Sequence, residues 1–218
     1  MIALELPVIV IGGGGHAKVL VSALLLRERS VLGFVDLNLK LSPLLGAPHL
    51  GNDSAVLGHP PDSVQLVNGV GSISCTRNHQ NVYDWFVQKR YCFATVVHPS
   101  AVVAPEVQIE DGVQVLAGAV VQAGCRLGAN VIVNTGARVD HDCIIDSHAH
   151  IAPGVTICGG VHVGTGAHIG AGATVIQGIR IGAGSVVGAG ALVIRDVPQG
   201  AKVVGVPAAS MPERGTKR

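Results

Sequence analysis

The second half of the chain carries an aliphatic residue at every sixth position. From Val97 to Val193, seventeen consecutive hexads begin with Val, Ile or Leu without exception. Small or β-branched residues follow four positions later, and Gly, Asn or Asp often lies in between. A helix, with its period of about 3.6 residues, cannot produce this pattern. It predicts one short strand per hexad and three hexads per triangular coil, and hence a left-handed parallel β-helix over residues 93–198, with a C-terminal tail at 199–218.

Residues 1–92 follow a different pattern, in which apolar runs of strand length alternate with longer segments of helical length. The predicted strands are 6–11, 30–35 and 63–70, and the predicted helices are 16–28 and 81–89. Such alternation is typical of βαβ units with a parallel sheet. We therefore expect a small, Rossmann-like α/β domain that joins the β-helix near residues 92–96.

Composition restricts the kinds of partner. Charged residues make up 13% of the chain and the formal net charge is +1, so electrostatics favour neither nucleic acid nor an anionic membrane surface, and small substrates are expected. The sequence has no run of 18 apolar residues and does not begin with a signal-peptide pattern, so we expect a cytoplasmic protein. Five cysteines without CxxC spacing indicate reduced thiols, and Cys125 and Cys143 fall at inward positions of the β-helix wall.

A glycine-rich turn separates the first predicted strand from the first predicted helix. Gly12, Gly14 and Ala17 match the G-x-G-x-x-G/A fingerprint of nucleotide-binding βαβ units, and Asp36 ends the second strand. The unit is about half as long as a full dinucleotide fold, so a single nucleotide is the more economical ligand. The turn is not a P-loop, because the residues where Gly-Lys-Ser/Thr is required are Ala17, Lys18 and Val19. The alternative is a turn that only packs the helix on the strand.

Half of the ten histidines fall within one part of the predicted β-helix. They are His141, His148, His150, His162 and His168. One interpretation is a zinc site, because neighbouring coils can present imidazoles to a metal. The other is a general base at His141, because Asp140 and Asp142 flank it and carboxylates orient an imidazole and stabilise its protonated form. Gly159 lies one coil above His141 and leaves room for a thioester or an oxyanion beside it. We expect His148 and His162 to be exposed on the prism faces.

Four segments of the sequence resemble one enzyme family. They are residues 11–19 with the glycine-rich turn, 98–101 where the β-helix begins, 134–143 around His141, and 205–208 near the end. Over nearly its whole length the chain is similar to the bacterial nucleotide-sugar N-acetyltransferases of the PglD, perosamine N-acetyltransferase and NeuD type. The resemblance implies an N-terminal domain that binds the nucleotide of a UDP- or GDP-linked amino sugar. It also implies a homotrimer of β-helices that binds acetyl-CoA between subunits, without a metal.

The same resemblance implies roles for individual residues. His141 is then the general base that takes a proton from the sugar amine, Asp142 is its carboxylate partner, and His150 contacts the acetyl-CoA thioester. The residues implied for acetyl-CoA binding are Asn134, His150, Gly159, Ala171 and Ala189. Those implied for nucleotide-sugar binding are Gly14, Gly15, His16, Asp36 and Gly71.

These observations together predict an acetyl-CoA-dependent N-acetyltransferase of a nucleotide-linked deoxyaminosugar, serving surface-glycan or glycoprotein biosynthesis. Three alternatives stay open. They are O-acetylation of a sialic-acid-type sugar, a zinc hydratase resembling the γ-class carbonic anhydrases, and a non-catalytic nucleotide-sugar-binding or scaffold protein. The sequence distinguishes neither UDP from GDP nor the position of the amine.

Overall fold

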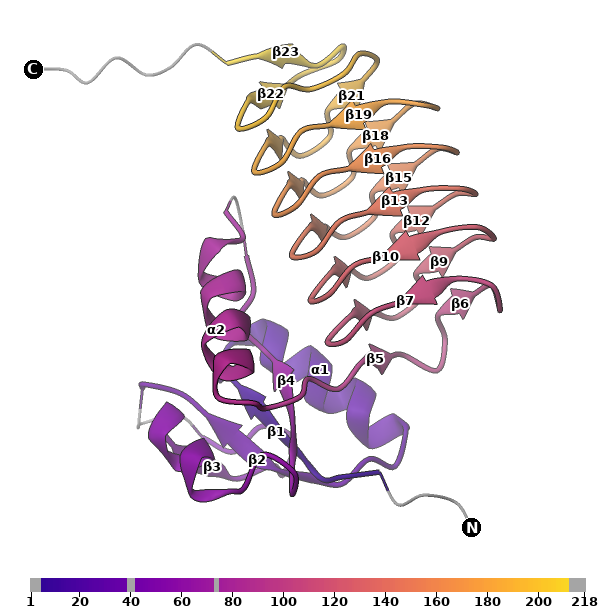
Figure 1. Ribbon diagram of the computed structural model, residues 1–218. Coiled ribbons are helices and arrows are strands. Elements are labelled where there is room, and N and C mark those ends of the chain that lie inside the picture. Colours follow the sequence, from indigo (N-terminus) through magenta and orange to yellow (C-terminus); the bar gives the residue numbers. More distant parts are fainter. Residues whose placement is uncertain (1–4, 39–41, 73–74, 212–218) are drawn as a thin grey trace, which may run out of the picture.

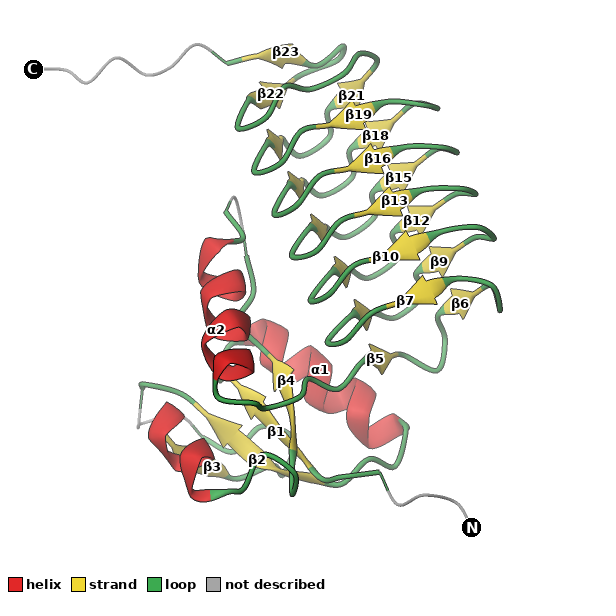
Figure 2. Cartoon of the chain, viewed as in Figure 1, coloured by secondary structure: helices red, strands yellow, loops and turns green. Residues whose placement is uncertain are grey.

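The chain folds into two parts. A computed structural model describes residues 5–38, 42–72 and 75–211. Figure 1 shows a layered α/β unit at the N-terminal end and a triangular prism of short strands that rises from beside it. In Figure 2 the helices belong to the first part, whereas the second part consists of strands and turns. None of the described helices is long and apolar enough to cross a membrane.

The first part is a four-stranded parallel sheet with helices on both faces. Its strands are β1 Val8–Ile11, β2 Val31–Val35, β3 His49–Gly51 and β4 Gln65–Asn68, in the order β3-β2-β1-β4, and its helices are α1 Gly15–Leu26, the 3-10 helix η1 Asp53–Gly58 and α2 Arg77–Gln88. Because side chains alternate along a strand, Val8 and Val10 pack with α1. Ile9 and Ile11 pack on the other face with α2 and η1. The predicted strands and helices are confirmed, but α2 begins at Arg77 rather than at 81, and β3 and η1 were not predicted.

The second part is a β-helix with three faces, each named here after its first strand. The β5 face contains β5 Val96–Val97, β8 Gln114–Val115, β11 Ile132–Val133, β14 His150–Ile151, β17 His168–Ile169, β20 Val186–Val187, β22 Lys202–Val204 and β23 Ala209–Ser210. The β6 face contains β6 Val102–Val103, β9 Val120–Val121, β12 Arg138–Val139, β15 Thr156–Ile157, β18 Thr174–Val175 and β21 Leu192–Val193. The β7 face contains β7 Gln108–Ile109, β10 Arg126–Leu127, β13 Ile144–Ile145, β16 His162–Val163 and β19 Arg180–Ile181. The parallel register pairs Ile132 with His150, which lies eighteen residues later in the chain. This spacing is the one expected for three hexads per coil.

The aliphatic residues of the hexads form the core of the prism. Val133, Val139 and Ile145, one from each face, are almost completely buried, and so are the wall residues Cys125 and Cys143. Each residue stacks on its equivalents in the coils above and below, so many small contacts replace the large aromatic core of an ordinary domain. Strand β22 continues the β5 face beyond residue 198, and β23 pairs with it in the antiparallel direction and covers its edge.

One turn position of each hexad has a left-handed backbone. From Gly112 to Gly190, every sixth residue has a positive φ. Glycine adopts this conformation without steric cost, and it fills all of these positions except Asn130, Asp142 and His148. A side chain in the left-handed region is strained, although Asn and Asp tolerate it better than most residues.

Candidate functional site

The carboxyl ends of β1 and β4 lie beside the N-terminus of α1, and the region between these three ends is called the crevice below. The sheet order β3-β2-β1-β4 puts the topological switch point here, which is where open α/β sheets bind ligands. Gly14 and Gly15 are exposed, and a Cβ at either position would meet no atom within 4 Å. The first N–H groups of a helix lack partners within the helix and attract anions. The crevice therefore has the geometry of a phosphate site.

Asp36 holds the glycine-rich turn of this crevice. Its Oδ2 accepts a hydrogen bond from the backbone N–H of Gly13 at 2.7 Å, and its Oδ1 accepts one from the N–H of Asn38 at 2.8 Å. Asp36 directly follows β2, so its carboxylate ties the end of this strand to the turn that follows β1. In this structure the Asp36 carboxylate therefore holds the backbone of the crevice in place.

The loop after β4 forms the opposite wall of the crevice. A Cβ at Gly71 would stand 3.2 Å from the Cβ of His16, so this glycine lets the loop lie close to α1. Gly69 is packed more tightly still, because a Cβ there would lie 2.7 Å from the carbonyl oxygen of Ile11 and 2.8 Å from the Cβ of Ala17. The two glycines bring the loop and the glycine-rich turn together.

His16 connects the crevice to the β-helix. Its Nε2 lies 2.7 Å from Oε1 of Gln114, a fully buried residue of β8. The Gln114 Nε2 donates to the carbonyl oxygen of Asn68 at 2.8 Å, which leaves Oε1 as the acceptor and gives His16 the tautomer with its proton on Nε2. Burial lowers the pKa of His16 below its usual 6.5, and the Gln114 hydrogen bond opposes this shift. A neutral His16 then keeps Nδ1 as an acceptor.

Two stacked histidines lie further along the outer surface of the β5 face. His150 and His168 are paired across β14 and β17, and their rings meet edge to face with 5.0 Å between centroids. Both side chains are almost completely buried. The Asn134 Nδ2 lies 3.0 Å from the His150 Nε2. Burial, reinforced by the nearby His168, lowers the pKa of His150 to about 3, so this imidazole is neutral at physiological pH.

His141 and Asp142 lie at the corner between the β6 and β7 faces. The Nδ1 of His141 is 2.9 Å from Oδ2 of Asp142, and the imidazole packs so closely on Gly159 that a Cβ there would overlap the ring. The Asp142 hydrogen bond, assisted by the charge of Asp140, raises the pKa of His141 above 6.5. With Nδ1–H donated to the carboxylate, Nε2 is the ring atom that can accept a proton. This is the geometry of a general base beside an open backbone.

The predicted site residues form two groups on different sides of the prism. One group consists of the crevice residues Gly14, Gly15, His16, Asp36 and Gly71, together with Asn134 and His150 on the β5 face. The other consists of His141, Asp142 and Gly159. In Figure 1 the turns that join the β6 face to the β7 face project away from α2, so the base and the crevice of one chain do not meet.

The predicted residues Ala171 and Ala189 lie on the same side of the prism as the first of these groups. Both are exposed and lie one coil apart, at the corner between the β5 and β6 faces. Asn134 directly follows β11 at the same corner and so lies between these alanines and His150. The four residues predicted for acetyl-CoA other than Gly159 therefore share one side of the prism.

His148 is not exposed, and this prediction was wrong. Only 8% of its surface is accessible, and its ring meets Tyr83 of α2 edge to face. The Nδ2 of Asn130 lies 3.1 Å from the His148 Nδ1. The reason is that α2 covers this corner of the prism, which the repeat pattern does not reveal. His162 is partly exposed, as expected, with its Nε2 2.8 Å from Oδ2 of Asp146.

Sequence reasoning also missed the polar contact between the two parts. Asn68 Nδ2 lies 3.2 Å from Asn130 Oδ1, and the buried His79 has its Nδ1 2.6 Å from the carbonyl oxygen of Val70 and its Nε2 3.2 Å from that of Asn130. Asn130 and His148 stand at the turn position where nearly every other hexad has glycine. That departure from the repeat was the available signal for both residues.

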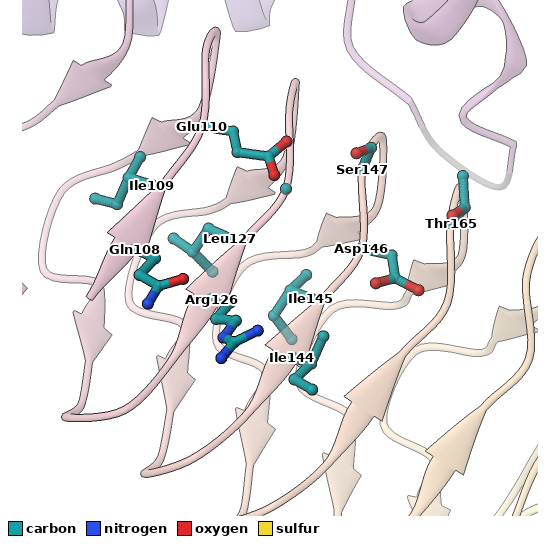
Figure 3. A pocket seen from close by; sticks show the side chains of 11 residues that line it. Gln108, Ile109, Glu110, Arg126, Leu127, Ile144, Ile145, Asp146, Ser147 and Thr165 are labelled. Atoms are coloured by element: carbon teal, nitrogen blue, oxygen red, sulfur yellow. The ribbon is translucent and has the colours of Figure 1, made fainter. Parts of the chain in front are cut away.

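A separate groove of about 510 Å³ crosses the β7 face. Figure 3 shows the side chains along it, with Glu110, Asp146 and Ser147 towards the upper end of the face and Arg126 near its middle. None of the predicted site residues lines this groove. Within residues 5–38, 42–72 and 75–211, no group of three or more His, Cys, Asp or Glu side chains could hold a metal ion.

Comparisons with known proteins cover both parts of the chain. The family model of the PglD N-terminal domain matches residues 7–83, and that of the bacterial transferase hexapeptide matches residues 106–141. The comparison with curated protein sequences gave no match. Among solved structures, a variant of perosamine N-acetyltransferase from Caulobacter crescentus, in complex with CoA and GDP-perosamine, is 37% identical with a TM-score of 0.89, covering 95% of this chain and 97% of that one.

Two further structures have the same architecture. The acetyltransferase domain of PglB from Neisseria gonorrhoeae, in complex with acetyl coenzyme A, is 33% identical with a TM-score of 0.89, covering 95% of this chain and all of that one. WeeI from Acinetobacter baumannii, at 24% identity and a TM-score of 0.85, supports the fold alone. With matches to both parts and more than a third of residues identical over nearly the full length, the chain belongs to the PglD and perosamine N-acetyltransferase family of hexapeptide-repeat acetyltransferases.

Proposed function

We propose that the protein transfers the acetyl group of acetyl-CoA to the amino group of a nucleotide-linked deoxyaminosugar, as a step in surface-glycan or glycoprotein synthesis. The observation that carries the proposal is the similarity, over 95% of the chain, to an N-acetyltransferase whose structure holds CoA and GDP-perosamine. A second similar protein holds acetyl coenzyme A. Both substrates are intracellular metabolites, so the reaction takes place in the cytoplasm.

The nucleotide part of the sugar substrate binds in the crevice between β1 and β4. Gly14 and Gly15 leave the N-terminus of α1 open to the diphosphate, because no side chain covers their backbone. His16 and Gly71 form the sides of the crevice, and Asp36 fixes the turn beneath it. UDP- and GDP-linked sugars share the diphosphate, so this part of the site accepts either class of nucleotide-sugar substrate.

His141 acts as the general base. Its Nε2 takes a proton from the sugar amine as the amine nitrogen attacks the acetyl carbonyl carbon, and Asp142 stabilises the imidazolium that forms. The backbone N–H of Gly159, which donates to no acceptor among the described residues, stabilises the oxyanion. When the C–S bond breaks, the CoA thiolate takes the proton from His141 and leaves as the thiol. This transfer needs no cysteine nucleophile, and the nearby Cys143 is buried in the wall.

Acetyl-CoA lies along the corner between the β5 and β6 faces. Ala171 and Ala189 are small and exposed there, so they leave a channel for the pantetheine arm. Asn134 and His150 lie at the thioester end of this channel. The thioester then lies on the side of the prism that carries the crevice, away from the His141 of the same chain.

A second copy of the chain therefore completes each active site, and we propose a homotrimer in which every subunit offers its crevice to one neighbour and its His141 corner to the other. The outward residues of the β6 face, which lies between these two regions, are Val102, Val120, Arg138, Thr156, Thr174 and Leu192, with one charge among them. The outward residues of the β7 face are the more polar set Gln108, Arg126, Ile144, His162 and Arg180, with two arginines. An apolar face favours burial against a neighbour, and a charged face favours water.

Mixing two inactive variants tests this arrangement. Gly15→Glu puts a negative charge in the crevice at a position where a Cβ meets no atom within 4 Å, and His141→Ala removes the base. If each site takes one half from each of two chains, random co-assembly restores about a quarter of wild-type activity. Co-expressed variants that stay inactive, although size-exclusion chromatography and mass spectrometry detect mixed trimers, would place the whole site in one chain.

The central experiment measures thiol release from acetyl-CoA with a panel of UDP- and GDP-linked amino sugars. Each sugar is paired with its hydroxyl analogue, and products are identified by mass spectrometry. We expect acetylation of an amino sugar only. Turnover of a hydroxyl sugar alone would indicate an O-acetyltransferase, stoichiometric zinc with carbon dioxide hydration would indicate a hydratase, and failure to bind acetyl-CoA would indicate a binding protein.

A further inference from the structure

Ser72 links the loop of the crevice to the β5 face. It directly follows Gly71, which the proposed function places beside the nucleotide. Its Oγ lies 2.7 Å from Nδ1 of His150 and 3.5 Å from Nδ1 of His168. The residue next to one proposed substrate contact therefore hydrogen-bonds the imidazole of another.

The orientation of the Asn134 amide determines which nitrogen of His150 carries the proton. Its Oδ1 accepts the backbone N–H of Thr135 at 2.8 Å, so its Nδ2 faces the His150 Nε2 at 3.0 Å. An amide NH₂ only donates, so Nε2 of the neutral ring is an acceptor and the ring proton is on Nδ1. That proton is donated to the Ser72 Oγ. The Ser72 hydroxyl then has its own proton to donate, and His168 Nδ1 is within reach.

A hydroxyl is suited to this place because it both accepts and donates. A backbone carbonyl or a carboxylate in its position would hold the proton permanently on His150 Nδ1. The Ser72 hydroxyl, in contrast, also supports the other tautomer by turning its own proton towards Nδ1. A thioester carbonyl at Nε2 needs that other tautomer, because a carbonyl oxygen only accepts hydrogen bonds.

We propose that Ser72 is a positioning residue that orients His150 and hydrogen-bonds its Nδ1 in either ring tautomer, so that the nucleotide crevice and the acetyl-CoA side of one chain are coupled through the Gly71–Ser72 peptide. The proposal rests on the proposed function for its kinetic consequences. The hydrogen bonds of Ser72 to His150 and His168 do not depend on that function.

The test compares three variants of the full chain. Ser72→Ala removes the hydroxyl, and Ser72→Thr keeps it. Thr76→Val is the matched control, because the Thr76 hydroxyl also crosses from the α/β unit to the prism, donating to the carbonyl oxygen of Gly166 at 2.8 Å, but it does not contact His150. Ser72 is partly exposed, so loss of its hydroxyl leaves the fold intact, which melting curves verify.

The first measurement is independent of activity. Protein labelled with ¹⁵N-histidine gives the tautomer of each ring by NMR, and comparison with His150→Gln identifies the His150 signals. We expect Ser72→Ala to shift both His150 nitrogen signals, and Ser72→Thr and Thr76→Val to leave them near wild type. Saturation with UDP or GDP should shift the same signals in wild type but not in Ser72→Ala.

The second measurement is steady-state kinetics. Loss of one hydrogen bond to the buried imidazole lowers kcat about 5- to 10-fold in Ser72→Ala, with KM for the nucleotide sugar within about twofold of wild type and Ser72→Thr largely restored. Unchanged His150 signals in Ser72→Ala, or an equal kinetic loss in Thr76→Val, would overturn the proposal. Wild-type protein that acetylates no sugar would refute the proposed function and leave the NMR result to decide the role of Ser72.

Discussion

Replacing Gly159 with alanine tests whether the proposed base, His141, must pack on the backbone of residue 159. The new Cβ would overlap Nε2 and Cε1 of His141, so the imidazole must leave its position over the backbone of residue 159. The His141 side chain is 54% exposed, so it turns into solvent instead of pushing the coils apart. Gly159 is not among the residues with positive φ, so its main chain accepts alanine. The fold should survive while the base is displaced.

The expected magnitudes differ between stability and activity. At a position with compatible backbone angles, Gly→Ala changes the free energy of unfolding by about 1 kcal/mol or less, and in the stabilising direction, because it restricts the unfolded chain. General acid–base catalysis accelerates a reaction by roughly 10²- to 10⁴-fold, and an enzyme with a displaced base loses much of this acceleration. We therefore expect Gly159→Ala to melt within a few degrees of wild type and to lose about 100-fold or more in kcat.

The assay is thiol release at saturating substrates, with thermal unfolding measured on the same samples. Gly58→Ala is the control, because Gly58 is exposed outside the proposed site and a Cβ there meets no atom within 4 Å. Wild-type turnover in Gly159→Ala would refute the placement of His141 over this glycine. A large loss of stability instead would mean that the overlap is relieved by the backbone.

Three further changes probe other parts of the molecule. Asp142→Asn removes the carboxylate that raises the pKa of His141, so the acid limb of the kcat/KM profile, where the base becomes neutral, should move to lower pH; an unmoved limb would contradict the pairing. Burial lowers the pKa of His79 to about 4, so between pH 6.5 and 4 the unfolded chain binds a proton that the folded chain does not, and stability should fall by up to about 3 kcal/mol as pH drops through this window. Urea unfolding of wild type and His79→Gln should show a weaker pH dependence in the variant. Ser185→Ala should raise the free energy of unfolding by about 1 kcal/mol, because the buried Ser185 hydroxyl has no hydrogen-bond partner in the described structure; equal or lower stability would argue for an unseen partner.

The β-helix was predictable from the sequence almost strand by strand. A slip of one residue would turn the whole aliphatic column outward, so the hexads leave only one register open. The same regularity predicted that Gly159 lies against His141, because stacked coils place residues eighteen apart in contact. Asp142 was predictable because it is the next residue in the chain and its carboxylate reaches Nδ1.

Contacts between the two parts were not predictable in this way. The hydrogen bonds of Ser72, Gln114 and Asn68 depend on how the α/β unit docks on the β5 face, and no local pattern encodes that orientation. His148 is an example: its position in the hexad predicts an exposed side chain, but α2 covers it. The start of α2 was missed because its first turn, with Arg77 and Asn78, carries no apolar periodicity.

The three non-glycine residues at left-handed turns lower the stability of the prism but make contacts that the proposed function needs. Asn130, Asp142 and His148 each carry backbone strain of about 1 kcal/mol that glycine would relieve. Asn130 and His148 contact the α/β unit, and Asp142 hydrogen-bonds the proposed base. Selection for heat resistance alone would therefore favour glycine at these turns. The prism would become more stable, but the α/β unit would lose its contacts with Asn130 and His148, and His141 would lose its hydrogen bond to Asp142.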